Sequence, residues 1–330
     1  GRHDARGGTV LRSGQSEPAG RGGLEGFPLQ YGSKSGAMMI SVVDAHVHVG
    51  QFGANYFDPF EIGQFLVRQG VVGCVASTPV AATGKHDEAI RDLDRLMSVA
   101  GLSVWPLLWV TPGLLARHPD LDAPLRRLPY RGLKIHPRAN KWSEAMLDRA
   151  FRAAEKRSIG ILLHTDPDYP AGIYQDLLLQ HPKVKVVLAH GRPIEQAQAV
   201  LRECPNAFVD TAFIPLPLIR GLVGQGFGDR IIFGSDAPID RCYYVGSSTR
   251  RYRARLQSIQ KALGPDQAGM VLGTNCDAVF RQSRHGLSEI RRWRQLPQAR
   301  TVRQRSVIGN ATGAPLRCQR KHRGMAKETT

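Results

Sequence analysis

The stretch SVVDAHVH, residues 41–48, decides the fold of this chain of 330 residues. It joins a short apolar run to two histidines, His46 and His48. A Val-rich run this short, with turn residues close by, predicts a buried strand and not a buried helix. Side chains two positions apart in a strand point to the same side, so we expect both imidazoles to face one way, with Asp44 one step deeper on that side.

Three further runs of the same kind end in a histidine or an aspartate. IGILLH (159–164) ends in His164, VKVVLAH (184–190) in His190, and IIFGSD (231–236) in Asp236. Continuous Val, Ile and Leu of this length are typical of parallel strands that are covered on both faces. Amphipathic segments of helical spacing lie between the runs, and this alternation predicts repeated βαβ units.

The full chain shows eight such runs, which predicts a single (β/α)₈ barrel over residues 38–282. Barrels of this kind carry their chemistry at the carboxyl ends of the strands, so the histidines and the aspartate should meet at one mouth. The predicted strands are 41–48, 71–78, 104–111, 132–137, 159–166, 184–191, 206–213 and 231–236. A final helix is expected over 267–282.

The two flanks differ from the predicted barrel in composition. Residues 1–37 are rich in Gly, Ser and Arg without periodicity, which predicts a disordered extension. Residues 283–330 carry twelve Lys or Arg against two Asp or Glu, so much of the net charge of +17 lies in a basic, largely disordered tail. A nucleic-acid-binding role for this tail remains an alternative, but we favour a solvated extension and no nucleic-acid partner.

Composition also limits the cellular setting. No apolar run approaches the roughly 18 residues of a membrane span, and the first forty residues lack the apolar core of a secretory signal. The five cysteines are scattered and form no C-x-x-C pair. We therefore expect a soluble, cytoplasmic protein without a membrane partner and without disulfide bonds. A homodimer is left open.

Five polar side chains are expected at the same mouth: His46, His48, His164, His190 and Asp236. One histidine at the end of a buried strand is usually a structural hydrogen-bonding group. Five such groups that converge at low dielectric have no partner except each other, and a cation would satisfy them. The pattern therefore predicts a metal site.

The pieces DAHVH, GLKIHP, LLHTD, VVLAHG, FGSDAP and GTNCDAVF together resemble the amidohydrolase superfamily of metal-dependent hydrolases. The resemblance covers residues 40–282 and is closest to the branch that includes aminocarboxymuconate-semialdehyde decarboxylase. It implies that His46, His48, His164 and Asp236 bind one divalent metal, and that His190 is a catalytic acid/base or a second-site ligand.

Zinc is the expected ion, because imidazoles and a carboxylate are ligands that suit it and leave room for a water. Such a site lowers the pKa of the water toward ~7, and Asp236 could accept its proton and pass it to the leaving group. A barrel that works without metal is a further alternative, as some relatives do.

The strand at 132–137 contains Lys134 and His136 with the same parity. In some members of the superfamily a lysine here is carboxylated and bridges two metals, so a second metal is an alternative, but we favour Lys134 as an electrostatic or substrate-binding residue. His136 is a candidate substrate-binding residue or a packed side chain. Arg192 and Arg241, with Arg138 nearby, could hold an anionic substrate by two parallel hydrogen bonds.

The sequence therefore predicts a metal-dependent hydrolase that acts on a C–O or C–N bond, in a lactone or an amide, of a small carboxylate-bearing molecule. The alternative on the same metal site is a non-oxidative decarboxylase or a hydratase of an unsaturated or aromatic acid. Fold and superfamily do not decide between these reactions.

Overall fold

The structure is a computed structural model that describes residues 40–239 and 249–281. Eight parallel strands form one sheet whose spatial order follows the sequence, as a (β/α)₈ barrel requires. The expectations for residues 1–37 and 283–330 lie outside the described residues. The strands are β1 (Val42–His48), β4 (Val71–Ser77), β5 (Ser103–Val110), β6 (Gly132–Ile135), β7 (Gly160–His164), β8 (Val186–Ala189), β9 (Ala207–Asp210) and β10 (Ile231–Ile232).

The first and last strands close the barrel. The backbone N–H of Ala45 donates to the carbonyl of Phe233 at 2.8 Å, and that of His48 donates to the carbonyl of Ala237 at 2.7 Å. A parallel bridge between Val47 and Ala237 lies on the same seam. The barrel fold predicted for this chain is thereby confirmed, with all eight predicted strands present.

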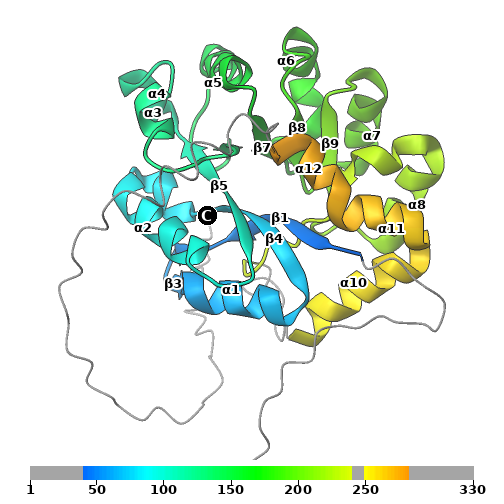
Figure 1. Ribbon diagram of the computed structural model, residues 1–330. Coiled ribbons are helices and arrows are strands. Elements are labelled where there is room, and N and C mark those ends of the chain that lie inside the picture. Colours follow the sequence, from blue (N-terminus) through cyan, green and yellow to red (C-terminus); the bar gives the residue numbers. More distant parts are fainter. Residues whose placement is uncertain (1–39, 240–248, 282–330) are drawn as a thin grey trace, which may run out of the picture.

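Helices surround the strands, as Figure 1 shows for α1 to α8. The first of them begins at Pro59, because the Asp58 side chain accepts hydrogen bonds from the backbone N–H groups of Phe60 and Glu61. The helices are α1 (Pro59–Arg68), α2 (His86–Met97), α3 (Pro112–Arg117), α4 (Asp122–Leu125), α5 (Glu144–Arg157), α6 (Gln175–Gln180), α7 (Ile194–Glu203), α8 (Leu216–Leu222), α10 (Thr249–Leu263), α11 (Pro265–Gly269) and α12 (Asn275–Phe280).

Several short elements were not predicted from the sequence. An antiparallel hairpin of β2 (Gly50–Phe52) and β3 (Asn55–Phe57) follows β1 directly. The helix expected at 267–282 is interrupted, because a π-helical turn (Met270–Thr274) separates α11 from α12. Further short turns of helix are Pro79–Thr83, Ala171–Tyr174, Val223–Phe227 and Gly228–Arg230.

Buried apolar side chains of the described residues form two layers and a small separate cluster of Val80, Ala81, Ala89 and Trp109. The larger layer lies between the strands and the surrounding helices. The smaller layer fills the barrel interior and includes Val43, Ala45, Leu162 and Val187. Cys276, Val279 and Phe280 of α12 join this interior layer, so α12 packs against one end of the barrel. The opposite end is left for polar groups.

An irregularity in β1 sets which of its side chains face inward. The register with β4 shifts between Asp44 and Val47. Val43 and Ala45 belong to the interior layer, whereas His46 and His48 line the pocket at the barrel mouth. The simple alternation expected for Asp44 is therefore wrong, because the shift breaks the period of two. Its carboxylate instead accepts hydrogen bonds from Ser235 Oγ at 2.6 Å and Tyr252 Oη at 2.7 Å.

Gly160 tests the packing of α12 against the barrel. A Cβ at this position would lie 2.6 Å from Val279 Cγ1 and 2.9 Å from the Val279 carbonyl oxygen. We expect Gly160→Ala to lower the free energy of unfolding by about 1–3 kcal/mol, because the backbone of α12 must shift. Gly269→Ala is the matched control, since nothing lies within 4 Å of its Cβ. Urea midpoints measure both; equal midpoints for the two variants would contradict the packing.

Candidate metal centre

The polar groups predicted for the barrel mouth do line one cavity. Its volume is about 920 Å³, and its walls come from the carboxyl ends of the strands and the loops after them. Most of the predicted site residues are among its lining: His46, His48, Lys134, His136, His164, His190, Arg192 and Asp236. Arg241 lies outside the described residues.

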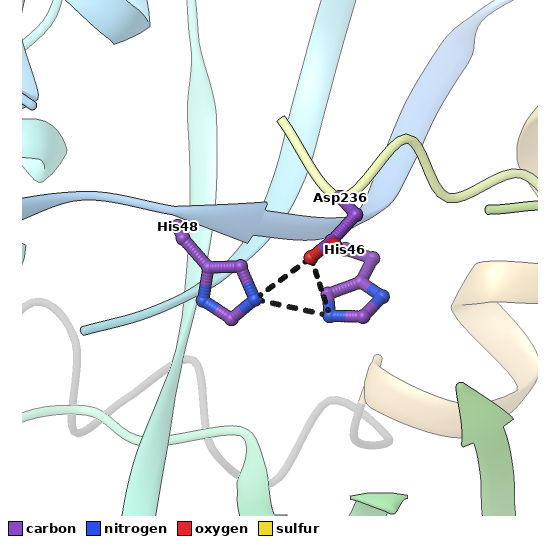
Figure 2. A group of neighbouring side chains, drawn as sticks. All are labelled: His46, His48 and Asp236. Atoms are coloured by element: carbon purple, nitrogen blue, oxygen red, sulfur yellow. Dashed lines mark hydrogen bonds and ion pairs between the residues drawn. The ribbon is translucent and has the colours of Figure 1, made fainter. Parts of the chain in front are cut away.

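Three of the predicted ligands form a close group, which Figure 2 shows. The Nε2 atoms of His46 and His48 lie 3.1 Å apart. Asp236 Oδ1 lies 3.3 Å from His46 Nε2 and 3.1 Å from His48 Nε2. All three side chains are buried. Residues from the first strand and from the loop after the last strand therefore meet at one point, as the sequence predicted.

Asp210, at the end of β9, sets the protonation of the His46 ring. Its Oδ2 lies 2.7 Å from His46 Nδ1. A carboxylate accepts a proton there, so Nδ1 carries the hydrogen and Nε2 keeps its lone pair toward His48 and Asp236. Asp210 was not predicted as a site residue, because the predicted strand 206–213 placed it inside the strand, whereas β9 ends at this residue.

His48 is held in a similar way from the neighbouring strand. Ser77 Oγ lies 3.1 Å from His48 Nδ1. When this hydroxyl accepts from Nδ1, the lone pair of Nε2 faces Asp236. Both strand-one imidazoles thus have one nitrogen bound by the protein and the other directed at the group.

His190 forms a second group with His46 and Asp210, in which one polar atom of each lies within 4.8 Å of the others. Its backbone N–H donates to Asp210 Oδ1 at 2.8 Å. Its backbone has a φ of +71°, and Asp236 has a φ of +58°. Left-handed backbone is uncommon for such residues and tends to occur at functional sites. Asp210 therefore orients His46 and His190 together.

His164 lies in the cavity but outside both close groups. Its Nε2 lies 3.1 Å from Asp166 Oδ2, and its ring is 5.0 Å from that of His190. Asp166 also accepts from Arg138 at 2.9 Å. A histidine paired with a carboxylate in this way can offer Nδ1 to a metal. Its assignment as a ligand stays a prediction.

Lys134 is fully buried beneath the group, with Nζ 3.2 Å from His46 Nε2. Burial lowers the pKa of its amine to about 8, while the carboxylates of Asp236 and Asp210 act in the opposite direction. Lys134 therefore stands at the centre of the site. Its carboxylation and its role toward a substrate stay predictions.

Burial also controls the charges of the ligand group. Burial lowers the pKa of His46 well below its ordinary value, and the nearby Lys134 ammonium adds to the effect. Burial alone would raise the pKa of Asp236, but the imidazoles of His46 and His48 outweigh it and hold that pKa well below its usual range. Asp236 is therefore ionised in this group.

These residues fit a divalent metal. Three acceptor atoms within about 3 Å of one another repel unless a proton or a cation lies among them. Imidazole nitrogen with carboxylate oxygen is a ligand set that divalent metals such as zinc accept. The buried partners Asp210 and Ser77 supply the outer contacts that metal-binding histidines commonly have.

The arginines Arg138 and Arg192, which both line the pocket, differ in the groups they contact. Arg138 pairs with Asp166 at 2.9 Å and with Asp168 at 3.3 Å. The guanidinium of Arg192 lies over the ring of Phe213, 5.2 Å from its centroid, and forms no ion pair within the described residues. The structure therefore distinguishes two arginines that the sequence could not rank.

Comparison with known proteins identifies the family. The sequence model of the amidohydrolase family matches residues 43–282, well over half of the chain. The chain therefore belongs to the amidohydrolase family and is an enzyme of this type. No curated protein matches it.

Solved structures share the fold at low identity. A probable 2-pyrone-4,6-dicarboxylic acid hydrolase from Acinetobacter baumannii aligns with a TM-score of 0.58 and 12% identity, over 73% of this chain and 100% of that one. A 4-oxalomesaconate hydratase from Rhodopseudomonas palustris aligns with a TM-score of 0.54 and 14% identity, over 77% and 100%. A protein of Agrobacterium tumefaciens aligns with a TM-score of 0.57 and 13% identity, over 75% of this chain and 98% of that one.

None of the helices in residues 40–239 and 249–281 has the length and apolarity to cross a membrane.

Metal content tests the group directly. We expect His48→Ala to lose most of the bound metal, because it removes one of the two imidazoles that contact Asp236. His118→Ala is the control, since His118 lies outside the cavity. Elemental analysis of the purified variants measures the effect, with circular dichroism to verify folding. Wild-type stoichiometry in a folded His48→Ala protein would exclude His48 as a ligand.

Proposed function

We propose that this amidohydrolase is a metal-dependent hydrolase that cleaves a C–O or C–N bond, in a lactone or an amide, of a small carboxylate-bearing molecule. The observation that carries the proposal is the buried group of His46, His48 and Asp236, whose polar atoms lie within 3.3 Å of one another. We propose Zn²⁺ as the ion, held by these residues with His164 as a fourth ligand.

A bound divalent ion would supply Lewis acidity and lower the pKa of a water at the site. Asp236 is then the proton acceptor, because its carboxylate is held ionised beside both imidazoles. From this position it can return the proton to the leaving group. Asp210, in contrast, is engaged with His46 and His190.

His190 and Lys134 are placed to act on the substrate carbonyl. The Nδ1 atom of His190 is buried and has no hydrogen-bond partner among the described residues. We assign it to polarise a carbonyl or to transfer a proton. Lys134 would stabilise negative charge that develops beside the metal, because its amine contacts a ligand atom and is withdrawn from solvent.

Arg192 is the group we assign to the substrate carboxylate. Arg138 is already paired with two aspartates, whereas Arg192 has no carboxylate partner within the described residues. Stacking on Phe213 holds its guanidinium at the cavity wall. A planar fork held in this way suits two parallel hydrogen bonds to a carboxylate.

Decarboxylation or hydration of an unsaturated acid would use the same ligands. The three reactions are separated by their products. Decarboxylation releases carbon dioxide, hydration adds water across a double bond, and hydrolysis cleaves the C–O or C–N bond of a lactone or amide. Assaying a panel of lactones, amides and aromatic acids for each of these products therefore decides among them.

Asp236→Asn tests the proton-transfer role. We expect turnover to fall at least 100-fold, because an amide cannot accept the proton, while a larger share of metal than of activity is retained. Asp229→Asn is the control, since Asp229 is exposed and lies outside the cavity. Turnover is measured on the best substrate of the panel and divided by metal content. Near-normal turnover would refute the role of Asp236.

Arg192→Met tests recognition of the carboxylate. We expect KM for carboxylate-bearing substrates to rise about tenfold or more, because a charged hydrogen bond is lost while the apolar stem is kept. Substrates whose carboxylate is replaced by an uncharged ester should change little. Arg220→Met is the control on an exposed site of α8. An unchanged KM would assign the carboxylate to another cation.

A further inference from the structure

His136 lies in the middle of a stack of three rings on the cavity wall. Its ring is 3.8 Å from that of His164 with an interplanar angle of 12°, and 5.6 Å from that of Trp109 with an angle of 11°. Neighbours on both faces restrict rotation of the imidazole. Only the edges of the ring are left for hydrogen bonds.

The backbone sets the tautomer of this ring. The N–H of Ala139 donates to His136 Nδ1 at 3.2 Å, and it is shared with the His136 carbonyl oxygen at 3.1 Å. A backbone amide can only donate, so Nδ1 must carry a lone pair. The proton of the ring is therefore on Nε2.

The Nε2–H group is open to the cavity. His136 lines the cavity, and Nε2 is not buried and has no hydrogen-bond partner within residues 40–239 and 249–281. The stacked neighbour His164 differs, because its Nε2 faces Asp166 at 3.1 Å. Two adjacent imidazoles thus have opposite roles: His164 keeps a lone pair on Nδ1, whereas His136 offers a proton.

The position of His136 shows which part of a ligand it can reach. Lys134 is fully buried beside His46 near the end of β6, and His136 follows two residues later, directly after the strand. Beyond His136 the chain turns, and the side chain of Arg138 is 59% exposed. Residues two apart along an extended chain are separated by about 6–7 Å. His136 therefore lies roughly one such step outward from the metal group, so it reaches an atom away from the reacting bond.

We propose that the Nε2–H of His136 donates a hydrogen bond to a carbonyl or carboxylate oxygen of the substrate, one step from the bond that reacts. This role in substrate binding rests on the hydrolase function proposed above. A fixed N–H donor binds an acceptor oxygen at this point. It excludes an N–H or ammonium group, because two donors would then face each other. His136 is thus a specificity-determining residue.

Benzoate and benzamidine test the selectivity, because they have the same shape with oxygen acceptors on an anion in one and N–H donors on a cation in the other. The His136 variants separate the hydrogen bond from this difference in charge, because they leave Lys134 and Arg192 in place. We expect benzoate to bind the full-length, metal-loaded protein and benzamidine not to compete with it. His136→Phe keeps a ring in the stack and should weaken benzoate about tenfold, as expected for a lost hydrogen bond to a charged acceptor. His136→Gln restores an N–H donor and should recover part of the affinity.

Two readouts do not depend on turnover. Titration calorimetry gives the affinities, with His118→Phe as control and metal content measured for each variant. Long-range ¹H–¹⁵N spectra give the tautomer of His136, identified as the signal that His136→Phe removes. An Nε2–H tautomer whose signal shifts on adding benzoate supports the proposal.

Three results would overturn the proposal. They are an Nδ1–H tautomer of His136, a benzoate affinity of His136→Phe equal to that of the wild-type protein, and benzamidine binding as tight as that of benzoate. The absence of benzoate binding to the wild-type protein would do the same. Failure of the whole substrate panel to be hydrolysed would count against the proposed reaction and leave these binding results unchanged.

Discussion

The seam between β1 and the segment after β10 is the interaction on which the site depends. Two backbone hydrogen bonds, from Ala45 to Phe233 and from His48 to Ala237, join the first strand to the last. The Asp44 carboxylate strengthens the seam, because it accepts from both the backbone N–H and the hydroxyl of Ser235. Without this closure, His46 and His48 would not meet Asp236.

The histidines at the barrel mouth are held in place by hydrogen-bond partners. Asp210 holds His46 by its ring and His190 by its backbone, and Asp166 holds His164. A carboxylate on one ring nitrogen directs the lone pair of the other, which is the arrangement that metal ligands need. At His136 a backbone amide takes the place of the carboxylate, and the proton then faces the cavity. The chemistry of each imidazole is thus set by what binds its far nitrogen.

Much of this organisation could be predicted from particular residues. Short Val, Ile and Leu runs with helical segments between them indicated eight strands, and a histidine or aspartate at the end of a run indicated the site. Asp210 was not identified, because the predicted strand ran on to residue 213 and placed this aspartate inside it, whereas β9 ends at Asp210. The side of Asp44 was predicted wrongly, because a register shift in β1 has no signature in the local pattern.

The sequence by itself determined the barrel, the end of the barrel that carries the polar groups, and the set of candidate ligands, because these follow from local periodicity and from strand order. Tertiary structure decided which groups touch, since the separation of two side chains across a barrel depends on register, backbone twist and packing. It placed Lys134 against His46, paired Arg138 with Asp166, and left Arg192 stacked on Phe213. Such choices arise from contacts between distant segments, which no stretch of sequence contains.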